Sequence, residues 1–165
     1  MSQTRIIRIP LSASQPAPFL IVDDQGRVLQ RGALTLEDPG PSLDVRTVAI
    51  TPGADVLVRW LNLPVGGATQ VRAAARWMLK DQLAGDPDRM VVALGAAASE
   101  PGGARLVAVV SASLLEAWVD YLAAMGVTAQ VMIPDSLTPP APQDPETLNG
   151  LSFGGRIGPR RGRVG

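Results

Sequence analysis

Short apolar runs that stop at proline or glycine are the feature of this 165-residue sequence that most limits its fold. Runs of about four to eight residues rich in Ile, Val and Leu, bounded by turn-forming residues, are typical of β-strands. Pro10, Pro64 and Pro134 each close such a run, because proline has no backbone N–H to donate to a sheet. The pattern predicts strands at residues 5–9, 19–22, 27–31, 45–51, 56–63, 90–94, 106–110 and 127–133.

Two other segments repeat apolar residues at the helical period. The first covers about residues 68–83, with an apolar stripe of Val71, Ala74, Ala75, Met78 and Leu79. The second covers residues 114–125. Ser113 and Glu116 have the spacing of a capping box, which predicts Ser113 as the N-cap, and Gly126 suits the position after the helix ends. Strands and helices in this order predict an α/β fold with a mixed sheet.

The sequence contains no cysteine and no histidine, which excludes several kinds of chemistry. Disulfides, Cys/His zinc sites and catalytic units that need a cysteine or a histidine are ruled out. Formal net charge is zero, because four arginines in residues 151–165 offset a net charge of −4 on the rest of the chain. The body of the chain has no basic bias, so we expect no nucleic-acid partner.

The sequence has no segment that approaches the roughly 20 apolar residues of a membrane helix. Its first eleven residues lack a sustained apolar stretch and a cleavage signal, so we do not expect them to be a signal peptide. We therefore expect this chain by itself to be soluble and cytoplasmic.

Carboxylates are the main candidates for a ligand site. Asp23 and Asp24 could hold Mg²⁺ through oxygen, but their place before a glycine favours a turn. Asp55 follows Pro-Gly and is also expected in a turn. Asp135 directly follows a strand, at the end where α/β proteins bind ligands, so it is the best candidate for a relic cofactor site. Capping or turn chemistry is the alternative for Asp135.

Trp77 is the candidate for partner binding. It lies off the apolar stripe of the first helix and shares a flank with Ala73 and Lys80. Because a tryptophan beside small residues on a polar flank can anchor a partner, Trp77 and Lys80 are the predicted partner-binding residues. Packing against another element of the same fold is the alternative. Trp118 is expected in the core, and the alternation around Trp60 leaves its face unassigned.

An ordered set of segments resembles the type II secretion system protein L family. Residues 51–64, which read Thr-Pro-Gly-Ala-Asp-Val-Leu-Val-Arg-Trp-Leu-Asn-Leu-Pro, look like that family's Pro-Gly-x-x-Val…Leu-Pro segment. The segments that fit the family's order around it are residues 6–10, 73–83, 106–110, 115–126 and 131–137. The resemblance rests on the order of these segments rather than on one specific motif, and it covers about residues 5–137.

The resemblance implies a partial actin-like, RNase-H-like domain related to type IV pilus assembly protein M. It implies a non-catalytic platform at the cytoplasmic side of the bacterial inner membrane, which recruits the secretion ATPase, protein E. Proteins M and F of the system are the other implied partners, and the full-length protein is expected to form homo-oligomers. The membrane segment would lie outside this chain, which reads as the first part of a longer protein.

The same resemblance raises an alternative, an actin-like nucleotide-binding protein or ATPase switch. Nucleotide-binding members carry an acidic residue and glycine after the first strand, where this chain has residues 8–11, Arg-Ile-Pro-Leu. The nearest match to their second phosphate loop is Ser152-Phe-Gly154-Gly155, with serine in place of the carboxylate. With Asp135, these two glycines are the residues of a weak candidate cofactor site. Both departures favour a scaffold with no catalytic residue, no metal and no cofactor. A stand-alone α/β domain with another binding role is the third interpretation.

The chain is expected to divide at about residue 137. Residues 1–137 would form the partial cytoplasmic actin-like domain, and residues 138–165 a loosely ordered tail rich in Pro, Gly and Arg. The prolines of the tail interrupt pairing, and its sparse apolar residues bury too little to offset about 1–2 kcal/mol of ordering cost per residue. A short strand is expected at 151–153. Limited proteolysis should cut first at Arg156, Arg160, Arg161 and Arg163.

Overall fold

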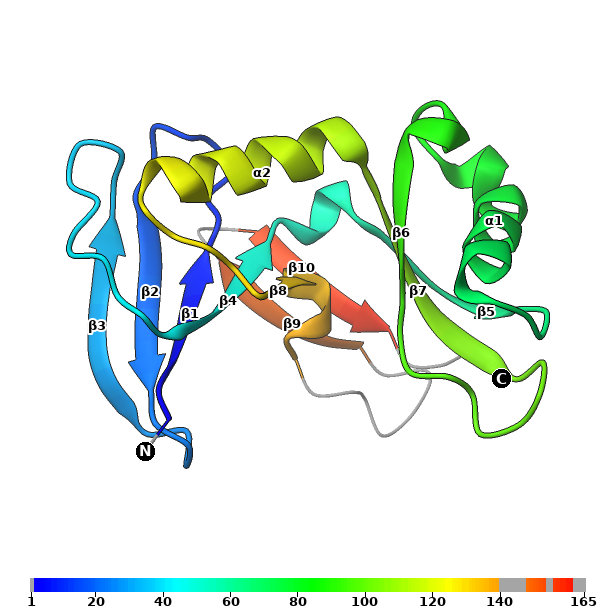
Figure 1. The fold of residues 1–165 in the computed structure, drawn as a ribbon, viewed down its shortest axis with the longest axis horizontal. Coiled ribbons are helices and arrows are strands. Elements are labelled where there is room, and N and C mark those ends of the chain that lie inside the picture. The colour runs from blue at the N-terminus through cyan, green and yellow to red at the C-terminus, as the bar shows by residue number, and fades with distance from the viewer. Residues whose placement is uncertain (1, 140–147, 154–155, 162–165) are drawn as a thin grey trace.

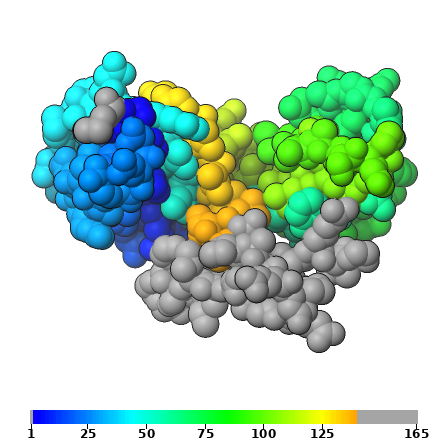
Figure 2. Space-filling view, turned by 90° about the horizontal axis from the view of Figure 1, so that it is seen from below, coloured from blue at the N-terminus to red at the C-terminus, as the bar shows by residue number. Residues whose placement is uncertain are grey.

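A computed structural model of the chain describes residues 2–139 and, for the backbone, 148–153 and 156–161. The described residues form two lobes, each a sheet covered by one helix (Figure 1). The first lobe contains both the start of the chain and the segment after the second helix, so the second lobe is an insertion within the first. Figure 2 shows this from below, with residues near 126–139 between the blue and green lobes.

The sheet of the first lobe has five strands in the order β3-β2-β1-β4-β8. Its strands are β1 (Thr4–Arg8), β2 (Ala17–Val22), β3 (Val28–Leu34), β4 (Arg46–Thr51) and β8 (Val131–Pro134). β2 is antiparallel to β1 and β3, whereas β1, β4 and β8 run parallel. The predicted α/β class with a mixed sheet is therefore confirmed. Burial alternates along β1 and β4, so that Ile7 and Ala49 lie on the buried face of the sheet together with the buried polar residues Arg5 and Thr47.

Helix α2 (Ala112–Ala124) covers one face of this sheet. Trp118 and Leu122 pack from the helix against Ile7, Phe19 and Ala49 of the strands, and all are buried. Trp118 is only 7% exposed, so its predicted place in the core is confirmed.

The two ends of α2 test the predicted caps. Ser111, rather than the predicted Ser113, is the N-cap, and its Oγ accepts the N–H of Leu114 at 3.2 Å. The prediction for Gly126 is confirmed: it has φ +70°, a conformation that side chains disfavour. Gly126 donates to the carbonyl of Ala123 and Val127 to that of Leu122, the paired bonds of a Schellman motif. Residues 127–130, predicted as strand, are the connection that follows this cap.

The second lobe is a three-stranded antiparallel sheet in the order β5-β7-β6, with helix α1 on one face. Its elements are β5 (Leu57–Asn62), α1 (Ala68–Leu79), β6 (Met90–Leu94) and β7 (Ala104–Ser111). Val71, Ala75 and Leu79 of the helix pack on Val92, Val107 and Val109 of the sheet to form a separate core. β7 runs directly into α2, which joins the lobes.

Short 3-10 turns and a final hairpin complete the described residues. The turns are η1 (Gly53–Asp55), η2 (Lys80–Gln82), η3 (Pro87–Arg89) and η4 (Asp135–Leu137). The predicted first helix thus ends as α-helix at Leu79 and continues as η2. Strands β9 (Leu148–Phe153) and β10 (Arg156–Arg161) pair antiparallel, and β10 lies beside η4. The strand predicted at 151–153 lies within β9.

Candidate functional site

The carboxyl edge of the five-stranded sheet is where a ligand site was expected. β1, β4 and β8 are parallel, so their ends lead together into Ile9, Pro52 and Asp135. Asp135 starts η4 directly after β8, and its Oδ1 accepts the backbone N–H of Gly53 at 2.9 Å. The backbone carbonyl of Asp135 accepts two bonds from Thr138, at 3.1 Å from its N–H and 2.7 Å from its hydroxyl.

Asp135 therefore ties the end of β4 to the end of β8, across 82 positions of sequence. The contact is close: a Cβ at position 53 would collide with Oδ1 of Asp135 and lie 3.1 Å from the N atom of Ser136. The carboxylate thus has a structural partner inside the fold. Gly154 and Gly155, the other residues of the candidate cofactor site, lie outside the described residues.

The other carboxylates singled out from the sequence lie in turns. Oδ1 of Asp23 accepts the N–H groups of Gln25 at 3.0 Å and Arg27 at 2.9 Å, and Oδ2 pairs with the guanidinium of Arg27 at 2.8 Å. The backbone hydrogen bond from Arg27 is the main cause that lowers the pKa of Asp23 below its usual value. The turn predicted for Asp23 and Asp24 is confirmed, as is that for Asp55 within η1. Among the described residues, no three acidic side chains gather closely enough to hold a metal ion.

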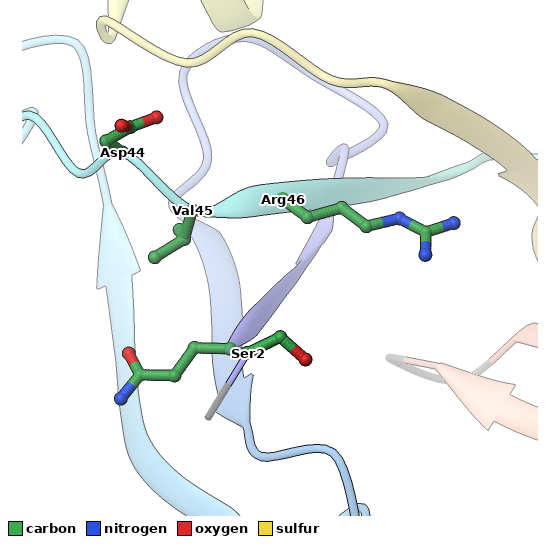
Figure 3. A pocket seen from close by; sticks show the side chains of 5 residues that line it. Ser2, Asp44, Val45 and Arg46 are labelled. Atoms are coloured by element: carbon green, nitrogen blue, oxygen red, sulfur yellow. The ribbon is translucent and has the colours of Figure 1, made fainter.

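A depression of about 390 Å³ lies at the opposite, amino edge of the sheet (Figure 3). It is shallow and open, and it is lined by Ser2, Gln3, Asp44, Val45 and Arg46. The charged side chains of Asp44 and Arg46 point apart rather than converge on one spot. A small-molecule site needs polar groups that converge in a concave pocket, so this depression does not have the form of one.

The outward side of α1 is the other candidate site. Trp77 is 70% exposed there, and the Nζ of Lys80 lies 3.7 Å from the centre of its ring. Trp77 comes two residues after Ala75, which turns it by about 200° to nearly the opposite side from the buried stripe. The structure thus brings the two predicted residues together, as a cation–π pair on the surface. Met78, predicted in the apolar stripe, is instead 47% exposed.

Arg72 and Arg76 belong to the same surface and were not singled out from the sequence. With Lys80 they recur every four residues, which places three cations in one row along the helix. The Nε of Arg76 is buried and has no hydrogen-bond partner. The signal that could have found this row is the absence of any Asp or Glu between residues 56 and 80.

Comparison with known sequences gives one family. The model of the family "Type II secretion system (T2SS), protein L" matches residues 6–151. A protein L of Dickeya chrysanthemi is 29% identical over 145 residues, which cover 84% of this chain and 35% of the relative. One of Pectobacterium carotovorum subsp. carotovorum is 26% identical over 145 residues, with coverage of 84% and 33%. The chain spans about a third of the length of these relatives.

Solved structures agree on the fold. The cytoplasmic domain of EpsL, an inner membrane component of the type II secretion system of Vibrio cholerae, matches with a TM-score of 0.73 at 21% identity. The match covers 93% of this chain and 65% of that domain. The PilM–PilN type IV pilus biogenesis complex matches with a TM-score of 0.58 at 12% identity, over 80% of this chain and 47% of that one. At these identities the similarity establishes the fold, and the expected actin-like class is confirmed.

Proposed function

Because the chain belongs to the type II secretion system protein L family, we propose that it is a non-catalytic platform that recruits the secretion ATPase, protein E. The family resemblance predicted from residues 5–137 is thereby confirmed, and the chain is a component of this secretion system. Its role in recruiting the ATPase is the proposal. The proposed place is the cytoplasmic side of the inner membrane, which is where the name of the Vibrio relative puts that protein.

The bond between Asp135 and Gly53 is the observation that carries the non-catalytic role. An actin-like nucleotide site would need carboxylates and close backbone approach at the carboxyl edge of the sheet. Here Asp135, the acidic residue that follows β8, accepts the N–H of Gly53. β1 is followed by Ile9 and Pro10, which offer neither a carboxylate nor a glycine. Mg²⁺ with its phosphates would therefore find little oxygen ligation along this described edge.

Further partners follow from the family as proposals. Proteins M and F of the system are proposed to contact the full protein, which is proposed to form homo-oligomers. No helix in the described part of the chain has the length and apolar character required to cross a membrane. Attachment to the membrane is proposed to use a segment outside these residues. Within the chain, residues 1–137 are the proposed domain and residues 138–165 the proposed tail.

Two calorimetric titrations test this function. The N-terminal region of the secretion ATPase should bind the full chain with saturable heat, whereas Mg-ATP should give none. Failure of the ATPase region to bind a folded chain would overturn the recruiting role. Saturable binding of Mg-ATP that Asp135→Ala abolishes would instead establish the nucleotide switch, since that variant removes the carboxylate from the candidate site.

A further inference from the structure

We propose that the outward side of α1 is the surface that docks the ATPase, and that it recognises an acidic segment bearing an apolar anchor. This inference rests on the proposed function and names the chemistry of its contact. The α1 docking face is defined by the residues Arg72, Ala73, Arg76, Trp77 and Lys80. Interfaces of this kind are enriched in tryptophan and arginine, which dominate their binding energy.

Trp77 supplies the apolar part of the recognition. Its ring is 70% exposed, and in the described structure its ring contact is with Lys80. A tryptophan ring buries about 150–250 Å² when covered, more than most side chains offer. Ala73 lies one turn before it and is also exposed, so an incoming side chain can reach the ring without obstruction from that position. The cation of Lys80 lies over part of the ring, and its large exposed remainder is available to an apolar anchor.

Within the residues that the structure describes, no ion pair neutralises the cations of the docking face. No Asp or Glu occurs between residues 56 and 80, and the ion pair seen in the described part of the chain joins Arg27 to Asp23 in the other lobe. Arg76 is partly exposed: its Nε is buried inside the fold, so a partner would meet the outer part of its guanidinium. Carboxylates from an acidic segment would supply both charge and acceptors.

The position of α1 leaves this face accessible. The helix lies on the outer rim of the molecule, with the sheet β5-β7-β6 between it and the five-stranded sheet (Figure 1). Val71, Ala75 and Leu79 anchor its inner side in the core of the second lobe. A partner can therefore cover the docking face while the fold stays as it is, which avoids the cost of ordering a loose segment.

Anionic lipid is the other surface that attracts tryptophan and cations. Helices that lie in a membrane interface insert an apolar stripe on the side that faces the lipid. The apolar stripe of α1 faces the opposite way, onto its own sheet. On the outward side of α1, Trp77 lies among cations and small residues, and Met78 is its one half-exposed apolar neighbour on the helix, which suits a charged protein partner better than a bilayer.

The test titrates the N-terminal region of the ATPase into the full chain and its variants, at low and at high salt. Trp77→Ala should weaken binding by about 30-fold or more, the loss typical of a central tryptophan. The double variant Arg72→Glu with Lys80→Glu should weaken it by at least about 10-fold and remove most of the salt dependence. Replacing Arg72 by Lys and Lys80 by Arg keeps both charges and should retain binding.

Matched controls come from the other lobe. Val119→Ala on α2 removes an apolar side chain that is 48% exposed, and Arg31→Glu on β3 reverses one exposed cation. Both should leave the affinity within about twofold, the range expected for residues outside an interface.

Each outcome of these titrations supports or refutes a stated part of the proposal. If the ATPase region binds all variants equally, the docking face is wrong while the recruiting function stands. If it fails to bind the wild-type chain, the recruiting function itself fails, and the assigned partner with it. Vesicles of phosphatidylglycerol and phosphatidylcholine in equal parts form the third arm. Suppose that the vesicles bind the wild-type chain but not the double variant Arg72→Glu with Lys80→Glu. If the ATPase region also fails to bind, the docking face is a lipid contact and the proposal is overturned.

Discussion

Removing the carboxylate of Asp135 should destabilise the chain, because the N–H of Gly53 then loses its acceptor. Hydrogen bonds to charged groups contribute about 1.5–3 kcal/mol, and Asp135 is half-buried, so water can partly replace it. We expect Asp135→Ala to lower the free energy of unfolding by about 1–2 kcal/mol. In a chain of this length that corresponds to a fall in Tm of about 2–4 °C per kcal/mol. Asp135→Asn keeps an oxygen acceptor and should cost less.

Gly53 makes the same contact testable from its other side. In Gly53→Ala the new methyl group would collide with Oδ1 of Asp135, and overpacking of this kind costs about 1–3 kcal/mol. Removing the carboxylate relieves most of that clash, so the double variant should be less destabilised than the sum of the single ones. We expect a coupling of about 1–2 kcal/mol, within the range seen for residues in contact.

Urea unfolding followed by tryptophan fluorescence gives the free energy of unfolding of the wild type, Asp135→Ala, Gly53→Ala and the double variant. The midpoint and the slope of each curve are fitted separately. Asp55→Ala is the matched control, since Asp55 is an exposed acid in the neighbouring turn. Two results together would contradict this prediction: Asp135→Ala lowers the free energy of unfolding no more than this control, and the effects of Asp135→Ala and Gly53→Ala add to within about 0.3–0.5 kcal/mol. The bond between Asp135 and Gly53 would then not stabilise the carboxyl edge of the sheet. Asp135 would then be a free carboxylate, and the case against a nucleotide site would rest on Ile9 and Pro10 alone.

Three further predictions follow from the described contacts. Ser111→Ala should lower the free energy of unfolding by about 0.5–2 kcal/mol through loss of the N-cap of α2, while Ser113→Ala changes it little; thermal unfolding distinguishes them. Leu122→Ala should cost about 2–5 kcal/mol, because this side chain is 1% exposed in the core, as urea unfolding would show. The lowered pKa of Asp23 means that its bonds stabilise the fold above the unfolded pKa of about 3.9, and that this contribution is lost as pH falls through the lower folded value. When the free energy of unfolding is measured over a series of acidic pH values, Asp23→Asn should lack the part of the decrease that comes from protonation of Asp23.

Much of the fold was predictable because its signals are local. Strands end where a proline removes a donor, as at Pro10, and the hairpin turn after Asp23 needs a glycine with φ +79° at Gly26. Gly126 marks the end of α2 for the same conformational reason. Such residues act within a few positions of themselves, so a single sequence carries the information.

The errors arise where pairing between distant segments decides the outcome. Ser113 has the better capping-box spacing, but β7 pairs with β6 as far as Ser111, opposite Met90. That pairing keeps Ser111 extended, with φ −65° and ψ 140°, so the helix begins at the next residue. Met78 has helical spacing for a core position, yet it lies at the flank of the buried stripe and is half exposed beside a sheet of only three described strands.

The candidate site residues also include some that local sequence could place and some that it could not. The outward position of Trp77 follows from helical spacing alone, and so does its meeting with Lys80 three residues later. The partner of Asp135 did not follow, because Gly53 lies 82 positions earlier and comes beside it through parallel pairing of β4 with β8. Sequence reasoning could name the acid at a strand end, but the structure was needed to show what that acid binds.

Stability and binding should depend on different residues in this chain. The bond between Asp135 and Gly53 lies at the edge of the first lobe, whereas the α1 docking face rests on the separate core of the second. Asp135→Ala should therefore lower the free energy of unfolding without changing the affinity for the ATPase region. Trp77→Ala should weaken the affinity for the ATPase region and leave the free energy of unfolding unchanged, because the ring lies outside both cores. If Asp135→Ala instead weakened binding as strongly as Trp77→Ala, the two lobes would act as one unit, and the contact could not be assigned to α1 alone.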